Sequence, residues 1–192
     1  MIGRCIFIDR DGVVNVERNY VHRIEDFEFV SGTPEAIRRL NNAGWTVVVV
    51  TNQSGIGRGF YTEADYQLLT VHIRKELARL GAHLDAVYHC PHTPDWNPPY
   101  GCDCRKPRPG LIFQAQAAFG LDLRSAVLVG DKKSDIDAGR AAGVPTCFLV
   151  ESGHALRPGD RESADGVFTC LADCVDLLLN PSPTPSLSSQ ND

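Results

Sequence analysis

Acidic, basic and hydroxyl side chains follow several short apolar segments of this sequence, close to the points where those segments end. The residues concerned are Asp9, Asp11, Thr51, Lys106, Asp131 and Asp135. Each has an ordinary explanation on its own, because an aspartate or threonine after a strand commonly caps a helix or forms a turn. Their occurrence together is more informative. If the apolar segments are strands of one sheet, carboxylates, a hydroxyl and an ammonium converge at one edge.

This convergence suggests phosphoryl transfer. Crowded carboxylates repel one another and need a cation, and hard oxygen ligands in an open site suit Mg²⁺. A phosphoryl dianion could lie between that ion and Lys106. Asp9 could then attack phosphorus to give an acyl phosphate. Asp11 could protonate the leaving oxygen and later take a proton from the attacking water.

A second group of residues has the spacing of a metal site. Cys90 and His92 form a C-x-H pair, and Cys102 and Cys104 form a C-x-C pair, with nine residues between the two pairs. Four nitrogen and sulfur ligands predict a closed, tetrahedral, structural Zn²⁺ site in this zinc loop, 90–104. The alternatives are unrelated loop cysteines or a redox pair. Basic residues follow Cys104 directly, so the ion would fix where they point.

Short apolar runs alternate with amphipathic segments along the chain. Strands are predicted over 5–8, 45–50, 84–90, 126–130 and 146–150, and helices over 33–44, 62–81, 110–120, 134–143 and 171–179. Thr33 and Thr62 are the expected N-caps of the first two helices, and Ile37 and Leu40 should face the core. The predicted fold class is α/β, a doubly wound parallel sheet covered on both faces. In such a fold the ligand site lies beyond the carboxyl ends of the strands.

Bulk properties limit the class of protein. With 192 residues, 43% of them hydrophobic, the chain is expected to form one domain over 1–179, with a disordered tail over 180–192. A net charge of −5 argues against a broad nucleic-acid surface. We find no apolar run that suits a membrane span and no signal peptide. Seven cysteines, an odd number, predict a reducing cytoplasm, and we expect a monomer.

Four segments resemble the motifs of the haloacid dehalogenase superfamily of aspartate-nucleophile phosphatases. They are "DRDGVVN" (9–15), "TNQSG" (51–55), "RKPRPG" (105–110) and "GDKKSD" (130–135). The D-x-D-G of the first segment is specific when the other three follow in order. The resemblance covers about residues 4–180 and implies the Rossmann-like fold of that superfamily.

The resemblance also implies a role for individual residues. Asp9 is expected to be the nucleophile and Asp11 the acid/base. Mg²⁺ is expected to be held by the Asp9 carboxylate, the Asp11 main-chain oxygen and Asp131. Lys106 would neutralise the nucleophile and the phosphoryl group. Asp135 would orient Lys106 or a metal-bound water.

The zinc loop narrows the resemblance further. The segments "FIDRDGVVNVERNYVH", "VVTNQSGIGRG", "CPH", "CDCRKPRPG" and "VGDKKSD" are similar to those of the D-glycero-D-manno-heptose-1,7-bisphosphate 7-phosphatase family of ADP-heptose and lipopolysaccharide core synthesis. They resemble, slightly less closely, the histidinol-phosphatase group, which shares the zinc loop. The catalytic residues of the family map to Asp9, Asp11, Thr51, Arg105 and Lys106. Its substrate-binding residues map to Glu17, Arg18, Asn19, Tyr20, Thr51, Asn52, Gln53, Ser54, Arg105, Lys106 and Lys132.

The expected activity is therefore Mg²⁺-dependent removal of the 7-phosphate from a sugar bisphosphate, with histidinol-phosphate hydrolysis as the alternative. The chain has no insertion large enough for a cap domain, so the site should be fairly open. Several basic residues could meet the second phosphate: Arg18, Arg58, Arg105 or Lys132. The sequence leaves open their order, the anomer at C1 and the role of the 93–101 loop.

Overall fold

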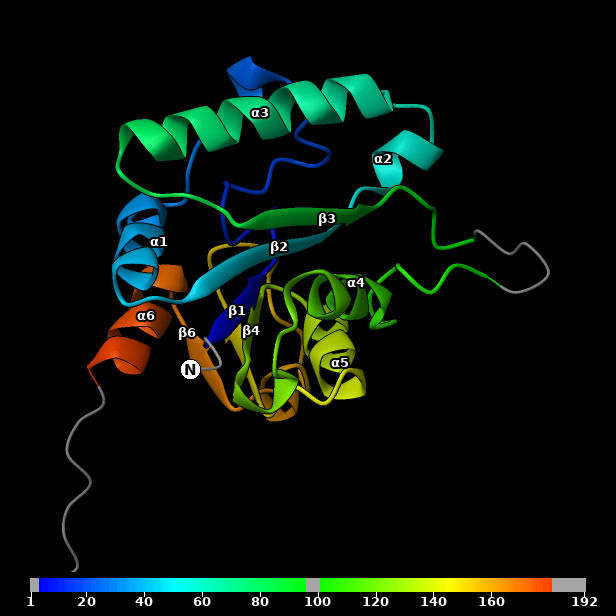
Figure 1. The fold of residues 1–192 in the computed structure, drawn as a ribbon. Coiled ribbons are helices and arrows are strands. Elements are labelled where there is room, and N and C mark those ends of the chain that lie inside the picture. The colour runs from blue at the N-terminus through cyan, green and yellow to red at the C-terminus, as the bar shows by residue number, and fades with distance from the viewer. Residues whose placement is uncertain (1–3, 96–100, 181–192) are drawn as a thin grey trace, which may run out of the picture.

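A single parallel sheet forms the centre of the computed structural model, which describes residues 4–95 and 101–180 (Figure 1). Within those ranges the sheet has the strand order β3-β2-β1-β4-β5-β6. The strands are β1 (Cys5–Ile8), β2 (Thr46–Asn52), β3 (Ala86–Cys90), β4 (Val127–Gly130), β5 (Thr146–Val150) and β6 (Gly166–Phe168). Every neighbouring pair is parallel, which confirms the predicted fold class.

Helices cover both faces of the sheet. They are α1 (Thr33–Asn42), α2 (Ser54–Gly57), α3 (Glu63–Arg79), α4 (Gly110–Phe119), α5 (Lys133–Ala141) and α6 (Leu171–Leu179). Buried residues of α1, α3 and α6 pack against one face, and those of α4 and α5 pack against the other. Short 3-10 turns lie at Ile24–Asp26, Leu123–Ser125 and Arg161–Ser163.

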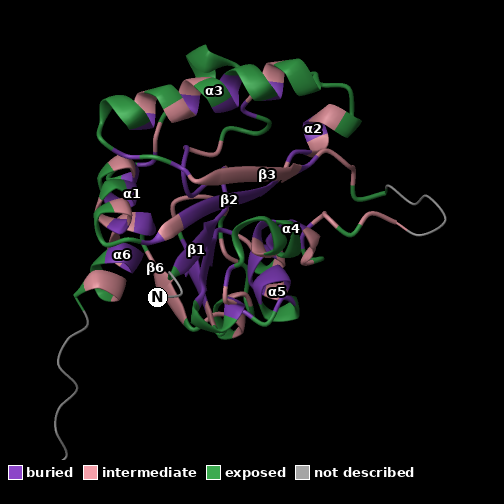
Figure 2. Cartoon of the chain, viewed as in Figure 1, coloured by how far each residue is buried: buried purple, intermediate pink, exposed green. Residues whose placement is uncertain are grey.

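Side-chain alternation along the strands supplies both hydrophobic layers. Ile6 and Ile8 of β1 point to the layer under α1, α3 and α6, whereas Cys5 and Phe7 point to the layer under α4 and α5. The same alternation divides the valines of β2. Strands β1 and β4 are buried throughout, and β2 is buried except at its two end residues (Figure 2). Fully burying each large apolar side chain contributes about 1.5–3 kcal/mol. Because both faces of these strands are covered by helices, their sequences are continuous apolar runs.

The helix termini confirm one predicted cap and correct another. Thr62 caps α3, accepting a hydrogen bond from Asp65 N, and the Asp65 carboxylate accepts one from Thr62 N in return. Thr33 is not the N-cap of α1. That position belongs to Gly32, at φ 80°, and Thr33 is the first helical residue. Its hydroxyl instead donates to the carbonyl oxygen of Val13 at 3.0 Å, which ties α1 to the segment after β1.

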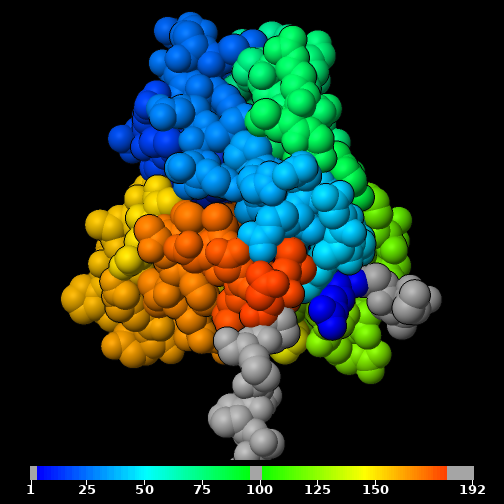
Figure 3. All heavy atoms as spheres, turned by 90° about the vertical axis from the view of Figure 1, so that its left-hand side faces the viewer, coloured from blue at the N-terminus to red at the C-terminus, as the bar shows by residue number. Residues whose placement is uncertain are grey.

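The last described helix lies against the first. In the space-filling view α6 lies against α1 (Figure 3), and Arg39 Nη1 pairs with Asp176 Oδ1 at 2.5 Å. The predicted tail lies outside the described residues apart from Asn180, so both that tail and the domain boundary at 179 stay predictions. Among the described helices, we find none with the length and apolar character needed to cross a bilayer.

The strand order contains a topological switch point. From β1 the chain continues outward through β2 and β3, whereas β4, β5 and β6 extend the sheet on the other side of β1. The loops that leave β1 and β4 therefore diverge and open a crevice between neighbouring strands. Ligands bind at such crevices in open α/β sheets.

Candidate active site

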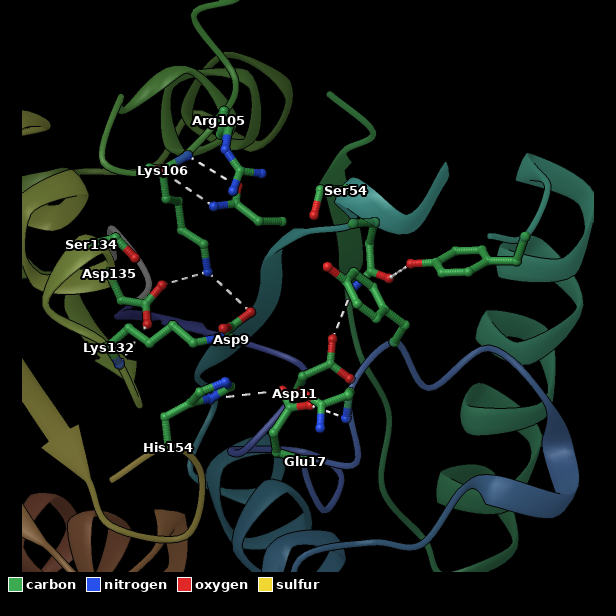
Figure 4. Close-up of a pocket in the computed structure, with 15 residues that line it drawn as sticks. Asp9, Asp11, Glu17, Ser54, Arg105, Lys106, Lys132, Ser134, Asp135 and His154 are labelled. Atoms are coloured by element: carbon green, nitrogen blue, oxygen red, sulfur yellow. Dashed lines mark hydrogen bonds and ion pairs between the residues drawn. The ribbon is translucent and has the colours of Figure 1, made fainter. Parts of the chain in front are cut away.

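A cavity of about 330 Å³ opens at the carboxyl edge of the sheet (Figure 4). Its walls come from the loops after β1, β2, β4 and β5 and from the segment before α4. The residues that line it are Asp9, Asp11, Glu17, Asn19, Tyr20, Asn52, Gln53, Ser54, Tyr61, Arg105, Lys106, Lys132, Ser134, Asp135 and His154. Most residues predicted for catalysis and binding thus lie around one space.

Lys106 forms the ionic centre of this space. Its ammonium nitrogen lies 3.0 Å from Asp9 Oδ1 and 2.6 Å from Asp135 Oδ1, and it donates to the Val50 carbonyl at 2.8 Å. Burial alone would lower the pKa of Lys106, but the charges of Asp135 and Asp9 outweigh it and raise that pKa. The ammonium therefore stays charged. This arrangement agrees with the expected role of Asp135 in orienting Lys106.

Three buried carboxylates lie close together, and two of them, Asp9 and Asp135, pair with that ammonium. Oxygen atoms of Asp9, Asp131 and Asp135 lie within 4.8 Å of one another. Asp131 Oδ1 is buried and has no hydrogen-bond partner among the described residues. Three carboxylates and one ammonium have a net charge of −2, which one divalent cation would balance. Buried charges are costly unless balanced, so the donor set fits a hard divalent cation such as Mg²⁺.

Asp11 lies in a separate environment, where the Arg10 guanidinium already balances its charge. Its Oδ1 accepts from Arg10 Nη2 at 2.8 Å, Arg10 Nε at 3.2 Å and Asn15 Nδ2 at 3.0 Å. Its Oδ2 accepts from Arg10 Nη2 and Gln53 Nε2, both at 2.9 Å. Burial would raise the pKa of Asp11, but the guanidinium and these hydrogen bonds lower it. The five hydrogen bonds fix the orientation of the carboxylate.

The segment after β2 joins these two groups. Gln53 Nε2 donates to Thr51 Oγ1 at 2.9 Å as well as to Asp11, and its Oε1 accepts from the Tyr61 hydroxyl at 2.6 Å. The Asn52 amide bonds the backbone of Lys106 in both directions, at 3.0 and 3.1 Å. Thr51 is buried behind the cavity lining, and Ser54 reaches the cavity.

The segment after β1 supplies the opposite wall. Glu17, Asn19 and Tyr20 line the cavity, and both Asn19 and Tyr20 have left-handed backbone conformations, with φ of 56° and 61°. Arg18 does not line it. Its guanidinium pairs with Glu28 and donates to the Asp26 carbonyl. The substrate-binding role expected for Arg18 stays a prediction.

The four zinc-loop ligands lie together. Sγ of Cys90 is 3.8 Å from Sγ of Cys102 and 3.0 Å from Sγ of Cys104, and both Cys90 and Cys104 lie 3.4 Å from His92 Nδ1. Zinc–sulfur bonds of about 2.3 Å imply sulfur–sulfur edges of about 3.8 Å in a tetrahedron. The cluster therefore has the ligand set and approximate size of a zinc site. Arg105, directly after it, donates to the His92 carbonyl at 3.0 Å.

Two important residues were missed in the sequence. Arg10 lies inside the D-x-D motif, but the sequence does not show that it is buried and pairs with Asp11. His154 follows β5, and its Nδ1 lies 2.7 Å from Asp131 Oδ2. The sequence signal for it is its position shortly after the fifth strand, because residues that follow strands line such sites. Most of the 93–101 loop lies outside the described residues.

Comparison with known proteins agrees with this geometry. A family model described as HAD-hydrolase-like matches residues 103–174. The chain is 48% identical over 154 residues to the D-glycero-alpha-D-manno-heptose-1,7-bisphosphate 7-phosphatase of Photorhabdus laumondii, covering 79% of this chain and 84% of that protein. It is 44% identical over 172 residues to the D-glycero-beta-D-manno-heptose-1,7-bisphosphate 7-phosphatase of Escherichia coli K12, covering 88% and 90%.

A solved structure is similar over nearly its whole length. The D,D-heptose 1,7-bisphosphate phosphatase of B. bronchiseptica, crystallised with magnesium and phosphate, superposes with a TM-score of 0.80 at 33% identity. The match covers 93% of this chain and 99% of that one. The named relatives do not favour the histidinol-phosphatase alternative, and they include both anomeric specificities.

Proposed function

The chain belongs to the haloacid dehalogenase-like hydrolases and, within them, to the D-glycero-D-manno-heptose-1,7-bisphosphate 7-phosphatase family, and we propose that it hydrolyses the 7-phosphate of that sugar bisphosphate for ADP-heptose synthesis. The observation that carries the proposal is the buried cluster of three carboxylates and one ammonium. Its carboxylate oxygens lie within 4.8 Å of one another, so one divalent cation could contact them together. The cluster adjoins a cavity whose walls bear hydrogen-bond donors and positive charge.

Asp9 is the proposed nucleophile. One of its oxygens attacks phosphorus, the bond from phosphorus to the sugar O7 breaks, and an aspartyl phosphate forms. Asp11, whose pKa is lowered in the free enzyme, would have to take up a proton when the substrate binds, and it would then give that proton to O7, which leaves as the alcohol. Asp11 then takes a proton from water as that water attacks the aspartyl phosphate, which releases inorganic phosphate and restores Asp9. Lys106 holds its positive charge beside Asp9 and the transferred group throughout.

Two metal ions are proposed. Mg²⁺ would be held by the carboxylates of Asp9 and Asp131 and by the main-chain oxygen of Asp11, and when bound it supplies positive charge that offsets the phosphoryl oxygens. The buried, unpartnered Asp131 Oδ1 supports this assignment. Zn²⁺ would close the ring of Cys90, His92, Cys102 and Cys104. It has a structural role, since four protein ligands leave no position for water.

The zinc loop and Asn52 are proposed to fix Lys106 from two sides. The zinc ligand Cys104 lies two residues before it, and the Asn52 amide bonds its backbone. A proline-rich segment has few backbone donors with which to hold itself. The metal therefore anchors the backbone that carries the ammonium.

The sugar bisphosphate is proposed to occupy the cavity beyond the nucleophile. Glu17, Asn19 and Tyr20 would contact sugar hydroxyls, whereas Arg105 and Lys132 would meet the second phosphate. Arg105 and Lys132 both line the cavity, which supports them over Arg18. None of the seven cysteines, all of which lie in the described ranges, forms a disulfide, which supports a reducing compartment such as the cytoplasm.

Phosphate release tests the proposal. The purified enzyme is assayed with both anomers of the heptose bisphosphate, with histidinol phosphate and with simple sugar monophosphates. We expect the highest kcat/KM for a heptose bisphosphate, with ³¹P NMR showing loss of the 7-phosphate while the C1 phosphate remains. EDTA should stop turnover and Mg²⁺ should restore it. A higher kcat/KM for histidinol phosphate would contradict the assignment.

A further inference from the structure

The loop after β5 is built around the carboxylate of Asp131. A Cβ atom added to Gly153 would lie 2.2 Å from Asp131 Oδ2, and one added to Gly12 would lie 2.6 Å from the same oxygen. Both distances are too short for any side chain. Ser152 Oγ donates to the Gly12 carbonyl at 2.6 Å, which ties this loop to the turn directly after Asp11. The loop therefore contacts the two segments that carry the proposed Mg²⁺ ligands.

His154 completes this enclosure. Its backbone N–H and its Nδ1–H both donate to Asp131 Oδ2, at 2.9 and 2.7 Å. A carboxylate can only accept, so Nδ1 must carry the proton. Both bonds reach the same oxygen, and Asp131 Oδ1 is left buried without a partner among the described residues. The pair of bonds fixes the rotation of the carboxylate and leaves one defined oxygen for the cation.

The imidazole also faces the substrate cavity. It lines that cavity, 41% of the side chain is exposed, and Nδ1 lies 3.8 Å from Glu17 Oε2 (Figure 4). The ring thus lies between a proposed metal ligand and the segment proposed to bind the sugar. Hydrogen-bond donors that orient metal ligands commonly change metal affinity or activity by about 10–100-fold when they are removed.

We propose that His154 is a positioning residue for Asp131, and that the Ser152–Gly153–His154 loop after β5 is a structural part of the metal site. This proposal rests on the proposed function only for the expected effect on turnover, because metal binding can be measured without a substrate. His154 does not bind the cation itself. It presents Asp131 Oδ1 in one orientation, so that the carboxylate does not have to be ordered when the cation binds.

Mn²⁺ titration of the metal-free site, followed by EPR, tests this directly. We expect His154→Ala to weaken Mn²⁺ binding about 10-fold, at the lower end of the usual range because the backbone hydrogen bond is retained. His154→Asn, whose side-chain N–H can reach a similar position, should recover much of the affinity. His83→Ala is the matched control, since His83 is exposed and its Nε2 lies 3.7 Å from Asp85 Oδ1, away from the metal site. Zinc content and thermal melting should match the wild type in all three variants.

Activity gives a second measurement. His154→Ala should raise the Mg²⁺ concentration needed for half-maximal rate, with kcat largely recovered at saturating Mg²⁺. An Mn²⁺ affinity equal to that of His83→Ala would overturn the proposal, whatever the activity. If His154→Ala binds Mn²⁺ weakly but the wild type hydrolyses no heptose bisphosphate, the positioning role stands and the proposed function fails.

Discussion

The orientation of Asp11 depends on Arg10, and Arg10→Lys tests this with the positive charge retained. Arg10 is 2% exposed and supplies three of the five hydrogen bonds that the Asp11 carboxylate accepts. Its Nη2 also donates to the Val21 carbonyl at 2.7 Å, which fixes the guanidinium itself. A lysine can present one ammonium nitrogen but not the planar fork. At least one of the two oxygens of Asp11 should therefore lose its arginine donor.

The magnitude follows from the lost contacts. Hydrogen bonds to a charged group contribute about 1.5–3 kcal/mol each, so losing two costs about 3 kcal/mol of unfolding free energy or more. At about 2–4 °C per kcal/mol for a chain of this size, the melting temperature should fall by about 6–12 °C. General base catalysis is worth about 10²–10⁴-fold, and a 1 Å displacement can remove about 10²-fold. We expect kcat to fall about 100-fold.

An aryl phosphate separates the two half-reactions. A nitrophenolate leaves without a proton, so formation of the aspartyl phosphate should be nearly normal in Arg10→Lys, whereas its hydrolysis, which needs Asp11 as base, should be slow. Stopped-flow measurement should show a burst of nitrophenolate close to one per active site, with kcat/KM little changed. Arg124→Lys, at an exposed arginine, is the control. If kcat and kcat/KM fall together without a burst, Arg10 has only a structural role.

Three further changes test other parts of the site. Asp9→Asn should abolish phosphate release with every substrate while the melting curve stays cooperative, because an amide is a poor nucleophile; residual turnover above about 1% of wild type would exclude Asp9. Cys102→Ser should lose bound zinc by elemental analysis and raise KM, and a zinc-free variant with normal kinetics would refute the anchoring role of the loop. Gly55→Ala should lower the melting temperature, because the added Cβ would lie 2.0 Å from Tyr61 Cε1 and overpacking costs about 1–3 kcal/mol; an unchanged melting temperature would contradict the tight packing there.

Periodicity and turn chemistry predicted most of the fold. The apolar run Val47–Val50 lies in a strand buried on both faces, and Thr62 is the N-cap of α3, as expected. The strand Gly166–Phe168 was not predicted, since three residues are too few to show a period. Thr33 has the sequence position of an N-cap, but a tertiary bond to Val13 draws its hydroxyl away. Local preference gave way there to a contact that only the fold provides.

The site was predictable as far as strand ends define it. The rule that functional groups follow strands placed Asp9, Asp11 and Lys106 around one cavity, but it does not predict the residues that contact each group from behind. Asn52 lines the cavity, so its expected contact with substrate stays a prediction, and its amide also bonds the backbone of Lys106, which the sequence did not predict. Arg10 is hidden for the same reason, because its partners depend on side-chain directions. The contacts that orient the reacting groups join residues far apart in the sequence or depend on side-chain direction, so the sequence pattern alone does not predict them.

The two motif aspartates are two residues apart but have opposite electrostatic surroundings. Burial raises the pKa of Asp9, and Asp135 and Asp11 add to this, with only Lys106 and Lys132 opposing. Asp11 keeps a lowered pKa because Arg10 accompanies it into the interior. A divalent cation among Asp9, Asp131 and Asp135 favours the ionised form of Asp9. Removing the metal should therefore make Asp9 harder to ionise and so a weaker nucleophile, while Asp11 keeps its lowered pKa, so that loss of metal acts first on the bond-forming step.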